Sequence, residues 1–366
     1  MRLSLNGYMP LNAFVDVGTV DLAHALDQLL ELGGSDLLIS CGSAPRIRRD
    51  GVLRPMDETM APLTVADTHR LIHEALSESQ FAELATNRSV DFAFTWRETV
   101  RVRGNAYYQR GSLAAAFRLL PMRIPSFHEL GIPQSVIDLI GRRQGLVLVT
   151  GPTGSGKSTT LAALVDHINH SRECHVVTIE DPIEYVHRHI TAVVDQRQVG
   201  TDTGSFADAL RSVFREDPDV ILIGEMRDLE TISSALTLAE TGHLVLATLH
   251  TNDASQAIDR VLDGFEASQQ QQVRIQLGAC LTGIVYQQLL PAVGGGRIAA
   301  FEVLVANSAI RALIKEGKTN QIRNALQTSL RDGSQTLERS LTQLIKSGLV
   351  TDHEARGRSL HAQEIG

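Results

Sequence analysis

The segment from Gly151 to Ser158, GPTGSGKS, constrains the fold of this chain more than any other stretch. It matches the pattern G-x-x-x-x-G-K-[ST] at every required position. The run before it, 145–150 (GLVLVT), is apolar and β-branched, which indicates a buried parallel strand. The run after it, 158–169, repeats apolar residues at helical spacing. Strand, glycine-rich loop and helix therefore follow one another, and such a loop binds phosphate in this arrangement.

Each residue type in this loop has a physical role. Glycines let backbone N–H groups turn inward around a phosphate, and the N-terminus of the following helix adds partial positive charge. We expect Lys157 to reach the β- and γ-phosphates and the Ser158 hydroxyl to bind Mg²⁺. The predicted nucleotide-binding residues are Gly151, Pro152, Thr153, Gly154, Ser155, Gly156, Lys157, Ser158 and Thr159. The loop indicates a nucleotide but leaves GTPases, kinases and motors open.

Composition narrows the class of protein. With 366 residues, 43% of them hydrophobic and 21% charged, the chain has the length of about two domains and an ordinary globular balance. It shows neither an apolar run long enough to span a membrane nor a secretory signal, so we expect a cytosolic protein. Three widely spaced cysteines argue against disulfides and against a Cys₄ zinc site. The net charge of −8 is unfavourable for DNA binding, and we expect no nucleic-acid partner.

The part of the chain before the loop has the pattern of a small α+β domain at 21–120, preceded by an extension at 1–20. An Asp-Gly pair at 50–51 lies between β-compatible flanks, which indicates a hairpin over 45–55. Two prolines in 121–132 indicate a linker. We expect helices at 22–32, 64–76 and 78–86, and strands at 36–40, 89–96, 100–109 and 113–120.

A second domain, expected at 133–347, alternates strands and helices up to about residue 265. This alternation predicts an α/β fold, in which helices cover both faces of a parallel sheet and ligands bind at the carboxyl ends of the strands. From about 266 we expect helices, with 348–366 as a C-terminal tail. The expected strands are 145–150, 175–180, 219–223 and 243–249. The expected helices are 157–169, 205–215, 228–240, 254–263, 266–290, 308–316, 319–329 and 335–347.

Three carboxylates, those of Glu180, Asp181 and Glu184, come at the end of the second expected strand in the segment TIEDPIE. The carboxyl ends of parallel strands meet at one edge of the sheet, so these acids should lie near the phosphates. Carboxylates in that position are costly unless they meet a cation or orient an attacking water. A solvated acidic loop is the alternative, but the place beside the phosphate loop favours a catalytic role.

The third and fourth expected strands also end in functional groups. The apolar strand at 219–223 is followed by Gly224 and Glu225, an arrangement typical of a Walker B acid that holds Mg²⁺ directly or through water. Gly224 stands where many such enzymes have Asp, so Glu225 is the available acid. The strand at 243–249 leads to His250, which could sense phosphate, polarise a neighbouring group or only cap a turn.

Arginines of the N-terminal domain are candidates for a second role at the nucleotide. An arginine finger supplies positive charge to the γ-phosphate in the transition state. The alternative is a solvated strand face, which the alternation of Arg101 and Arg103 suits. The candidates on the strands before the linker are Arg101, Arg103, Arg110 and Arg118.

Taken together, these segments resemble the secretion-type traffic ATPase superfamily, and within it the type IV pilus retraction ATPases. The resemblance covers about 21–347. GPTGSGKSTTLAAL is similar to the Walker A segment of the family, TIEDPIEYVH to its Asp box, DPDVILIGEMRD to its Walker B segment and ETGHLVLATLHTN to its His box. This resemblance implies a RecA-like P-loop ATPase domain with a PAS-like domain before it and helices after it. It also implies that the protein uses ATP and Mg²⁺.

The resemblance also implies roles for single residues. Glu184 becomes the candidate base that activates water, Glu225 the Walker B glutamate, and His250 an active-site or interface residue. The arginines that the N-terminal domain would lend to the nucleotide are Arg103, Arg110 and Arg118. The implied assembly is a hexameric ring at the inner face of the cytoplasmic membrane. Its implied partners are an inner-membrane pilus platform protein and, as a further candidate, a paralogous retraction ATPase.

The segment AIRALIKE at 309–316 resembles a motif associated with retraction motors. Ala312 stands where the family has Asn, and Lys315 where it has Arg, an exchange that keeps the charge but loses the guanidinium fork. The residues that match the motif are Ala309, Ile310, Arg311, Leu313 and Ile314. We therefore expect an ATP-driven motor for pilus retraction and twitching motility.

Other functions stay open from the sequence alone. A pilus extension or type II secretion assembly ATPase would carry a large extra N-terminal domain and a Cys₄ element, and only Cys280 follows His250 here. A conjugation-type traffic ATPase is disfavoured by the segment at 309–316. A non-catalytic ring subunit that only binds ATP is the alternative from another class. The presence of Lys157, Glu184, Glu225 and His250 weighs against it.

Overall fold

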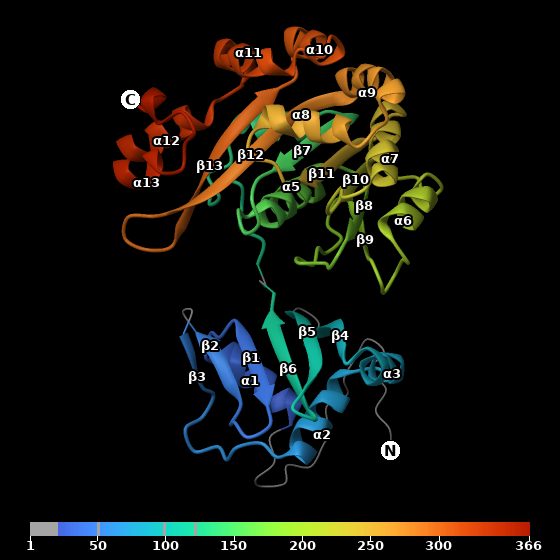
Figure 1. Ribbon diagram of the computed structural model, residues 1–366, viewed down its shortest axis with the longest axis vertical. Helices are drawn as coiled ribbons and strands as arrows, with labels where there is room; N and C mark the ends of the chain where they lie inside the picture. Colours follow the sequence, from blue (N-terminus) through green and yellow to red (C-terminus); the bar gives the residue numbers. More distant parts are fainter. Residues whose placement is uncertain (1–20, 50–51, 98–99, 121–122) are drawn as a thin grey trace. The chain divides into compact units, whose positions relative to one another are not determined.

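The computed structural model describes residues 21–49, 52–97, 100–120 and 123–366 (Figure 1). It consists of two compact units, one ending at Arg123 and including Glu184–Val186, the other formed by Ile124–Ile183 and His187–Gly366. The extension expected at 1–20, the Asp-Gly turn at 50–51 and the start of the linker at 121–122 lie outside the described residues. Within the described ranges, the helices are too short or too polar to cross a membrane.

The first unit is built on a six-stranded antiparallel sheet with the order β3-β2-β1-β6-β5-β4. Its strands are β1 Asp36–Ser40, β2 Arg46–Arg49, β3 Val52–Pro55, β4 Ser89–Trp96, β5 Val100–Gln109 and β6 Ser112–Leu119. Its helices are α1 Leu22–Glu31, α2 Val65–Ala75 and α3 Glu78–Asn87. The α+β character expected for 21–120 is confirmed.

Local sequence explains why the helices of this unit begin where they do. The side chain of Asp21 accepts a hydrogen bond from the first turn of α1, and Thr64 and Ser77 form capping boxes with Asp67 and Gln80 at the starts of α2 and α3. Such a cap contributes about 1 kcal/mol to helix stability. The core joins apolar residues of α1 and α2 to the inward-facing residues of β1, β5 and β6.

The second unit contains a seven-stranded sheet with the order β13-β12-β7-β11-β10-β8-β9 (Figure 1). All neighbouring pairs are parallel except β12 and β13, which are antiparallel. Its strands are β7 Gly145–Thr150, β8 His175–Glu180, β9 Val193–Gln198, β10 Val220–Ile223, β11 Leu244–Leu249, β12 Leu281–Pro291 and β13 Arg297–Val305. Its α-helices are α4 Gln134–Ile140, α5 Lys157–Ser171, α6 Phe206–Val213, α7 Leu229–Glu240, α8 Ala254–Asp263, α9 Ala267–Cys280, α10 Ser308–Lys315, α11 Ile322–Thr328, α12 Leu337–Lys346 and α13 Asp352–Arg356.

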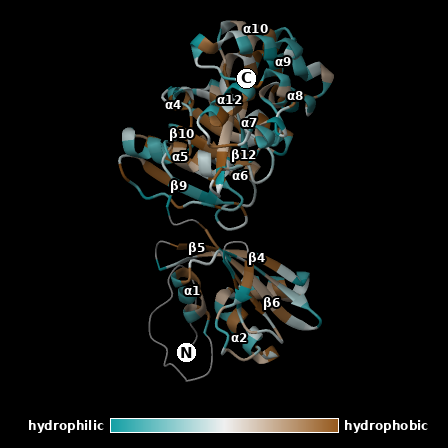
Figure 2. Cartoon of the chain, turned by 90° about the vertical axis from the view of Figure 1, so that its left-hand side faces the viewer, coloured by the Kyte–Doolittle hydropathy of each residue, from teal (hydrophilic) through white to brown (hydrophobic). Residues whose placement is uncertain are grey.

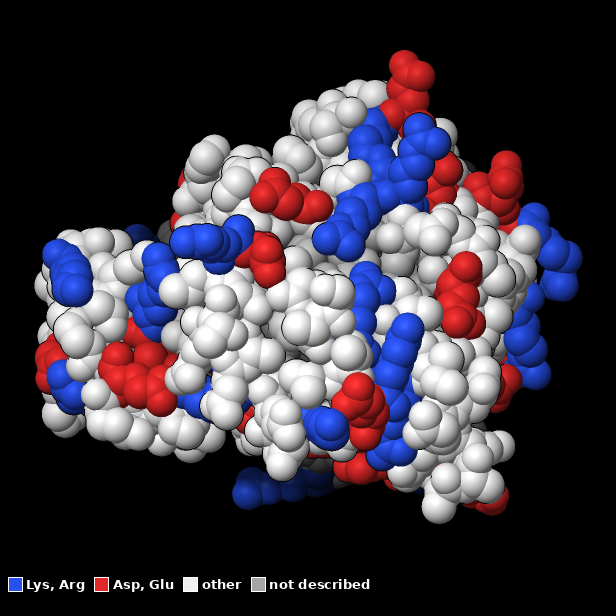
Figure 3. All heavy atoms as spheres, turned by 90° about the horizontal axis from the view of Figure 1, so that it is seen from above, with Lys and Arg blue, Asp and Glu red and all other residues white. Residues whose placement is uncertain are grey.

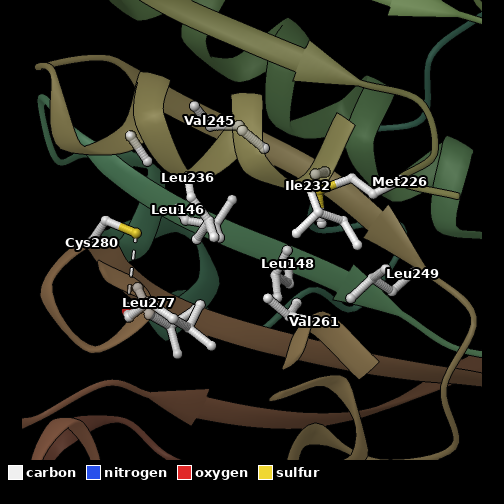
Figure 4. Close-up of a cluster of buried hydrophobic side chains, with 14 of the residues drawn as sticks. Leu146, Leu148, Met226, Ile232, Leu236, Val245, Leu249, Val261, Leu277 and Cys280 are labelled. Atoms are coloured by element: carbon white, nitrogen blue, oxygen red, sulfur yellow. Dashed lines mark hydrogen bonds between the residues drawn. The ribbon is translucent and has the colours of Figure 1, made fainter. Parts of the chain in front are cut away.

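Helices cover both faces of this sheet, as a parallel sheet requires. On β7, Leu146 and Leu148 belong to the core on one face, with α6 to α9, and Figure 4 shows part of this cluster. Val147 and Val149 belong to the core on the other face, with α4 and α5. Each buried Val or Leu side chain contributes about 1.5 to 3 kcal/mol. Figure 2 shows the hydrophobic residues concentrated inside each unit. The expected α/β fold is confirmed.

One expected helix is partly wrong. The segment 266–290 was expected as a single helix, but the helix ends at Cys280 and β12 begins at Leu281. The first residues of β12 are buried between β7 and β13, so the segment is apolar on both faces and shows no alternation. Periodicity cannot separate such a run from a buried helix. The strands β9 and β13 and the helix α4 were also not expected from the sequence.

A buried carboxyl group, that of Glu302 on β13, lies inside the second unit with 4% of its surface exposed. Its Oε1 atom accepts a hydrogen bond of 3.0 Å from the backbone N–H of Ala254, the first residue of α8. Burial raises the pKa of this carboxyl from 4.5 to about 7, and the nearby carboxylates of Asp253 and Glu338 act in the same direction. The native state therefore retains a proton that the unfolded chain releases at lower pH.

We predict that Glu302 makes the folded state less stable as pH rises from 4.5 to about 7. The stabilisation from the neutral carboxyl is fully present below pH 4.5, the ordinary pKa, and is lost as pH rises through about 7, the pKa in the folded state. Over this range the free energy of unfolding falls by at most about 1.4 kcal/mol per pH unit. Glu302→Gln, which cannot ionise, should flatten this dependence in denaturant unfolding. Glu316→Gln, at an exposed site, is the control. Equal slopes in Glu302→Gln and wild type would contradict the assignment.

Candidate functional site

The phosphate loop follows β7, which lies between β12 and β11 and is buried along its whole length. α5 begins at Lys157, and its N-cap is Gly156. Glycine has no side chain that could accept hydrogen bonds from the first turn of the helix, so the positive end of α5 faces the loop without a side-chain cap. This is the geometry of an anion site at a helix N-terminus.

Two glycines of the loop are required for different reasons. Gly151 has a φ of +144°, and a Cβ atom there would lie 2.3 Å from the carbonyl oxygen of Gln287 on β12. Gly154 has a φ of +78° with open space around it, so its requirement is conformational. The buried Ser155 Oγ atom has no hydrogen-bond partner among the described residues, as expected for a group that a phosphate could satisfy. The loop therefore fits the phosphates of a nucleotide.

A line of polar groups joins the loop to the two neighbouring strands. The Lys157 Nζ atom donates to the carbonyl oxygens of Gly151 and Pro152, at 2.7 and 3.0 Å, and lies 3.4 Å from Nδ1 of His250. Nε2 of His250 is 3.3 Å from Oε1 of Glu225. The strands β7, β11 and β10 are neighbours in that order. Lys157, His250 and Glu225 each follow one of these strands, so they lie side by side at one edge of the sheet. Lys157, His250 and Glu225, predicted separately, are thus brought together.

The carboxyl group of Glu225 is ionised at neutral pH. Arg227 Nη2 lies 2.8 Å from Glu225 Oε2, and this hydrogen bond holds the pKa of the carboxyl below its ordinary value of 4.5. Partial burial raises the pKa, but His250 also lowers it, so the net shift is downward. The hydroxyl of Thr248 at the end of β11 donates to the carbonyl oxygen of Gly224 at 2.5 Å, which ties the two strand ends together. The described residues contain no cluster of three or more His, Cys, Asp or Glu for a metal.

The three acids of the segment at the end of β8 have different surroundings. Oε1 of Glu180 accepts hydrogen bonds from Thr178 and Gln196, at 2.7 and 3.1 Å, so this carboxylate has a structural role within the sheet edge. Asp181 is exposed and contributes to the electrostatic field at Arg227. Glu184 is half-buried and belongs with residues 185 and 186 to the first unit. Its role as the base stays a prediction.

Residues 46–357 match the model of a protein family described as "Type II/IV secretion system protein". The chain belongs to the type II/IV secretion system protein family. Its second unit is accordingly the RecA-like P-loop ATPase part of that family, and the helices after β13 are its C-terminal helices.

Three relatives of known type are similar over nearly their whole length. The type IV pilus retraction ATPase PilT of Pseudomonas aeruginosa is 44% identical over 93% of this chain and 98% of its own. The type IV pilus ATPase PilU of the same organism is 39% identical over 94% of this chain and 90% of its own. A crystal structure of the pilus retraction motor PilT with bound ADP has a TM-score of 0.89 and 48% identity, covering 94% of this chain and 98% of that one.

The three arginines that the family resemblance singles out lie at two places in the first unit. Arg103 on β5 and Arg118 on β6 are directly opposite each other, and Asp36 accepts a hydrogen bond of 2.7 Å from Arg118. The acid offsets the repulsion of two like charges across the strands. Arg110 occupies the β5–β6 turn with a φ of +48°, an uncommon conformation for this residue type. It is about 23 Å from Arg103 along the strand, so the three do not form one cluster.

The motif helix α10 packs on the core through two of its residues. Ile310 and Ile314 are fully buried, Leu313 is partly buried against the same core, and Ala309 is exposed. These burial differences follow helical spacing, so one face of the motif is structural and the other is open to solvent.

Arg311 of the same helix binds backbone carbonyl groups. Its Nε atom donates to Ala306 at 2.9 Å, and its Nη1 atom donates to Gly278 at 3.2 Å and to Ala279. Gly278 and Ala279 lie in the last turn of α9, where carbonyl groups have no partner within the helix. Arg311 thus fixes the junction from α9 to β12, and this role could not be read from the motif.

A further residue at the loop was not predicted. Gln287 of β12 is 3% exposed and binds both Ser155 and Thr160 through its amide group. The sequence offers no local sign of this contact, since Gln287 lies 132 and 127 positions from Ser155 and Thr160 and 281–290 was expected to be helical. Only the pairing of β12 with β7 places it beside the loop.

We predict that Arg311→Ala lowers the free energy of unfolding by about 1 to 3 kcal/mol, because three backbone carbonyl groups, two of them in part-buried bonds, lose a charged donor. Arg311→Lys should recover only part of this, since lysine cannot bind several diverging carbonyls. Lys318→Ala, which removes an exposed ion pair with Glu316, is the control and should cost less than about 0.5 kcal/mol. Denaturant unfolding measures all three variants, and equal stability of Arg311→Ala and Lys318→Ala would sink the assignment.

Proposed function

We propose that this chain is an ATP-hydrolysing motor that powers the retraction of type IV pili and thereby twitching motility. The observation that carries the proposal is the contact line from Lys157 through His250 to Glu225, which joins the phosphate loop to the Walker B acid. The near full-length similarity to PilT supports the pilus as the object on which the motor acts.

The roles of the site residues follow from their positions. The backbone of 151–159 would cradle the phosphates, and Lys157 would add positive charge at the β- and γ-phosphates. Ser158 and Glu225 would hold Mg²⁺, Glu225 directly or through water, and the ion would neutralise charge on the phosphates. His250, which contacts both Lys157 and Glu225, fixes their relative position on the two sides of β11.

Glu184 is proposed as the base that orients the attacking water, and arginines of the first unit as donors of transition-state charge. Arg103 and Arg118 lie on one strand pair and Arg110 at the turn, so we propose that they serve different contacts. The unusual backbone conformation of Arg110 supports a functional reason for an arginine in that turn, because Gly or Asn would adopt it at lower cost.

The proposed assembly is a homo-hexameric ring with an inner-membrane pilus platform protein as partner, at the cytoplasmic face of the membrane. The exposed side of α10 is the proposed docking surface. In Figure 3, Lys and Arg side chains form a band flanked by acidic groups on the face that carries α10. A paralogous ATPase is a further proposed partner, and the occurrence of both PilT and PilU in P. aeruginosa supports it.

ATP turnover by the purified chain tests the enzyme. Lys157→Ala should abolish hydrolysis and weaken ATP binding, because it removes the charge that the loop offers to the phosphates. Glu184→Gln should bind ATP normally but hydrolyse it at least about a hundred times more slowly, since only the base is lost. Glu316→Gln, an exposed acid on the second unit, is the matched control. Unchanged turnover in Lys157→Ala would contradict the proposed nucleotide site, and unchanged turnover in Glu184→Gln only the base.

Retraction in pilus-bearing cells tests the motor. Ala309→Glu places a charge on the exposed side of α10, at the second residue of the helix, where an acid does not disturb folding. We expect ATPase activity within about twofold of wild type but loss of retraction and twitching. Ser79→Glu, at the exposed second residue of α3, should retain both. Normal retraction with Ala309→Glu would exclude this face as the docking surface.

A further inference from the structure

One side chain of β12, a strand far away in sequence but paired with β7, contacts the backbone of the phosphate loop. Gln287 donates from Nε2 to the carbonyl oxygen of Ser155 at 2.8 Å, across 132 positions of sequence. Its Oε1 atom accepts a hydrogen bond of 2.7 Å from the hydroxyl of Thr160, in the first turn of α5. Gln287 and Thr160 are 3% and 1% exposed, so water does not compete for these bonds. One amide group therefore joins the loop to the helix that follows it.

We propose that Gln287 is a positioning residue for nucleotide binding, which orients the peptide group between Ser155 and Gly156 so that its N–H faces the phosphates. The inference rests on the proposed nucleotide site. A trans peptide group is planar, and its C=O and N–H bonds point in opposite directions. Fixing the carbonyl of Ser155 against β12 therefore directs the N–H of Gly156 away from β12 and into the loop.

Backbone geometry around Gln287 supports this role. The pairing of β12 with β7 continues to Tyr286 opposite Thr150, so Gln287 comes level with Gly151 at the start of the loop. Cβ atoms built at Gly151 and Gly156 would lie 2.3 Å from the carbonyl oxygen of Gln287 and 2.9 Å from its Nε2 atom. Gln287 thus packs against both ends of the glycine-rich segment, and both glycines are needed for its close approach.

The chemistry of the two contacts specifies glutamine. The carbonyl group of Ser155 needs a donor, and the hydroxyl of Thr160 is met by an acceptor, so the side chain must supply both. Glutamate offers only acceptors and would repel the carbonyl of Ser155, while leucine of similar size offers neither group. Substitutions at this one position can therefore separate loss of the donor from loss of the whole contact.

The experiment compares nucleotide affinities of the purified full-length chain by calorimetry. For Gln287→Leu we expect ADP and ATP to bind about tenfold more weakly, and for Gln287→Glu more weakly still. AMP, which has no β-phosphate to seat in the loop, should bind within about twofold of its wild-type affinity. A structural defect would instead weaken all three nucleotides. The matched control is Gln288→Leu, because the next side chain on the same strand contacts Tyr286 and Arg358 and not the loop.

The outcomes separate this inference from the function on which it rests. If Gln287→Leu binds ADP as tightly as Gln288→Leu while Lys157→Ala does not, the positioning role is wrong and the nucleotide site stands. If Lys157→Ala also binds ADP normally, the proposed function itself fails. Equal losses for ADP and AMP would overturn the positioning role as well. Should Gln287→Leu fold poorly, Gln287→Met, an unbranched and flexible side chain that lacks both polar groups, gives the same comparison.

Discussion

The parallel pairing of β7 with β12 on one side and β11 on the other fixes the position of the loop at 151–158, around which the polar groups of the candidate site lie. Because β7 is buried on both faces and hydrogen-bonded along both edges, its carboxyl end is held in place. The first residue of the phosphate loop is therefore held in place as well. β11 brings His250 to the same edge, and β10 brings Glu225 one strand further. The site is therefore a consequence of strand order, with each strand contributing the residue that follows it.

Charge at this edge is balanced locally. Lys157, His250, Glu225 and Arg227 form a chain of contacts in which the one carboxylate lies between His250 and Arg227, so the Glu225 carboxyl stays ionised with its pKa below the ordinary value. An ionised carboxylate is the form that can bind a cation or a water molecule. Glu302, deeply buried on β13, is the opposite case, because burial raises the pKa of its carboxyl to about 7.

Much of the fold and of the site could be predicted where the information is local in sequence. The glycine loop, Glu225 and His250 each follow an apolar strand, and the caps of α1 to α3 lie within a few residues of the helices that they start. β12 could not be predicted, because a strand buried on both faces has no alternation to distinguish it from a helix. Because β12 was not predicted, the position of Gln287 beside the loop could not be predicted either. The carbonyl contacts of Arg311 lie at the junction between α9 and β12, which falls inside the single helix expected from the sequence.

These two unpredicted contacts lie on one continuous stretch of chain. Arg311 of the motif helix binds the carbonyls of Gly278 and Ala279, β12 begins at Leu281, and Gln287 holds the phosphate loop. From 281 to 287 the strand spans about 20 Å, is paired with both neighbouring strands over 283–286, and has an irregular register against β7 between 281 and 283. The glycine loop and the motif helix therefore contact the two ends of one stretch of chain, 278–287, without any side chain having to reach between them.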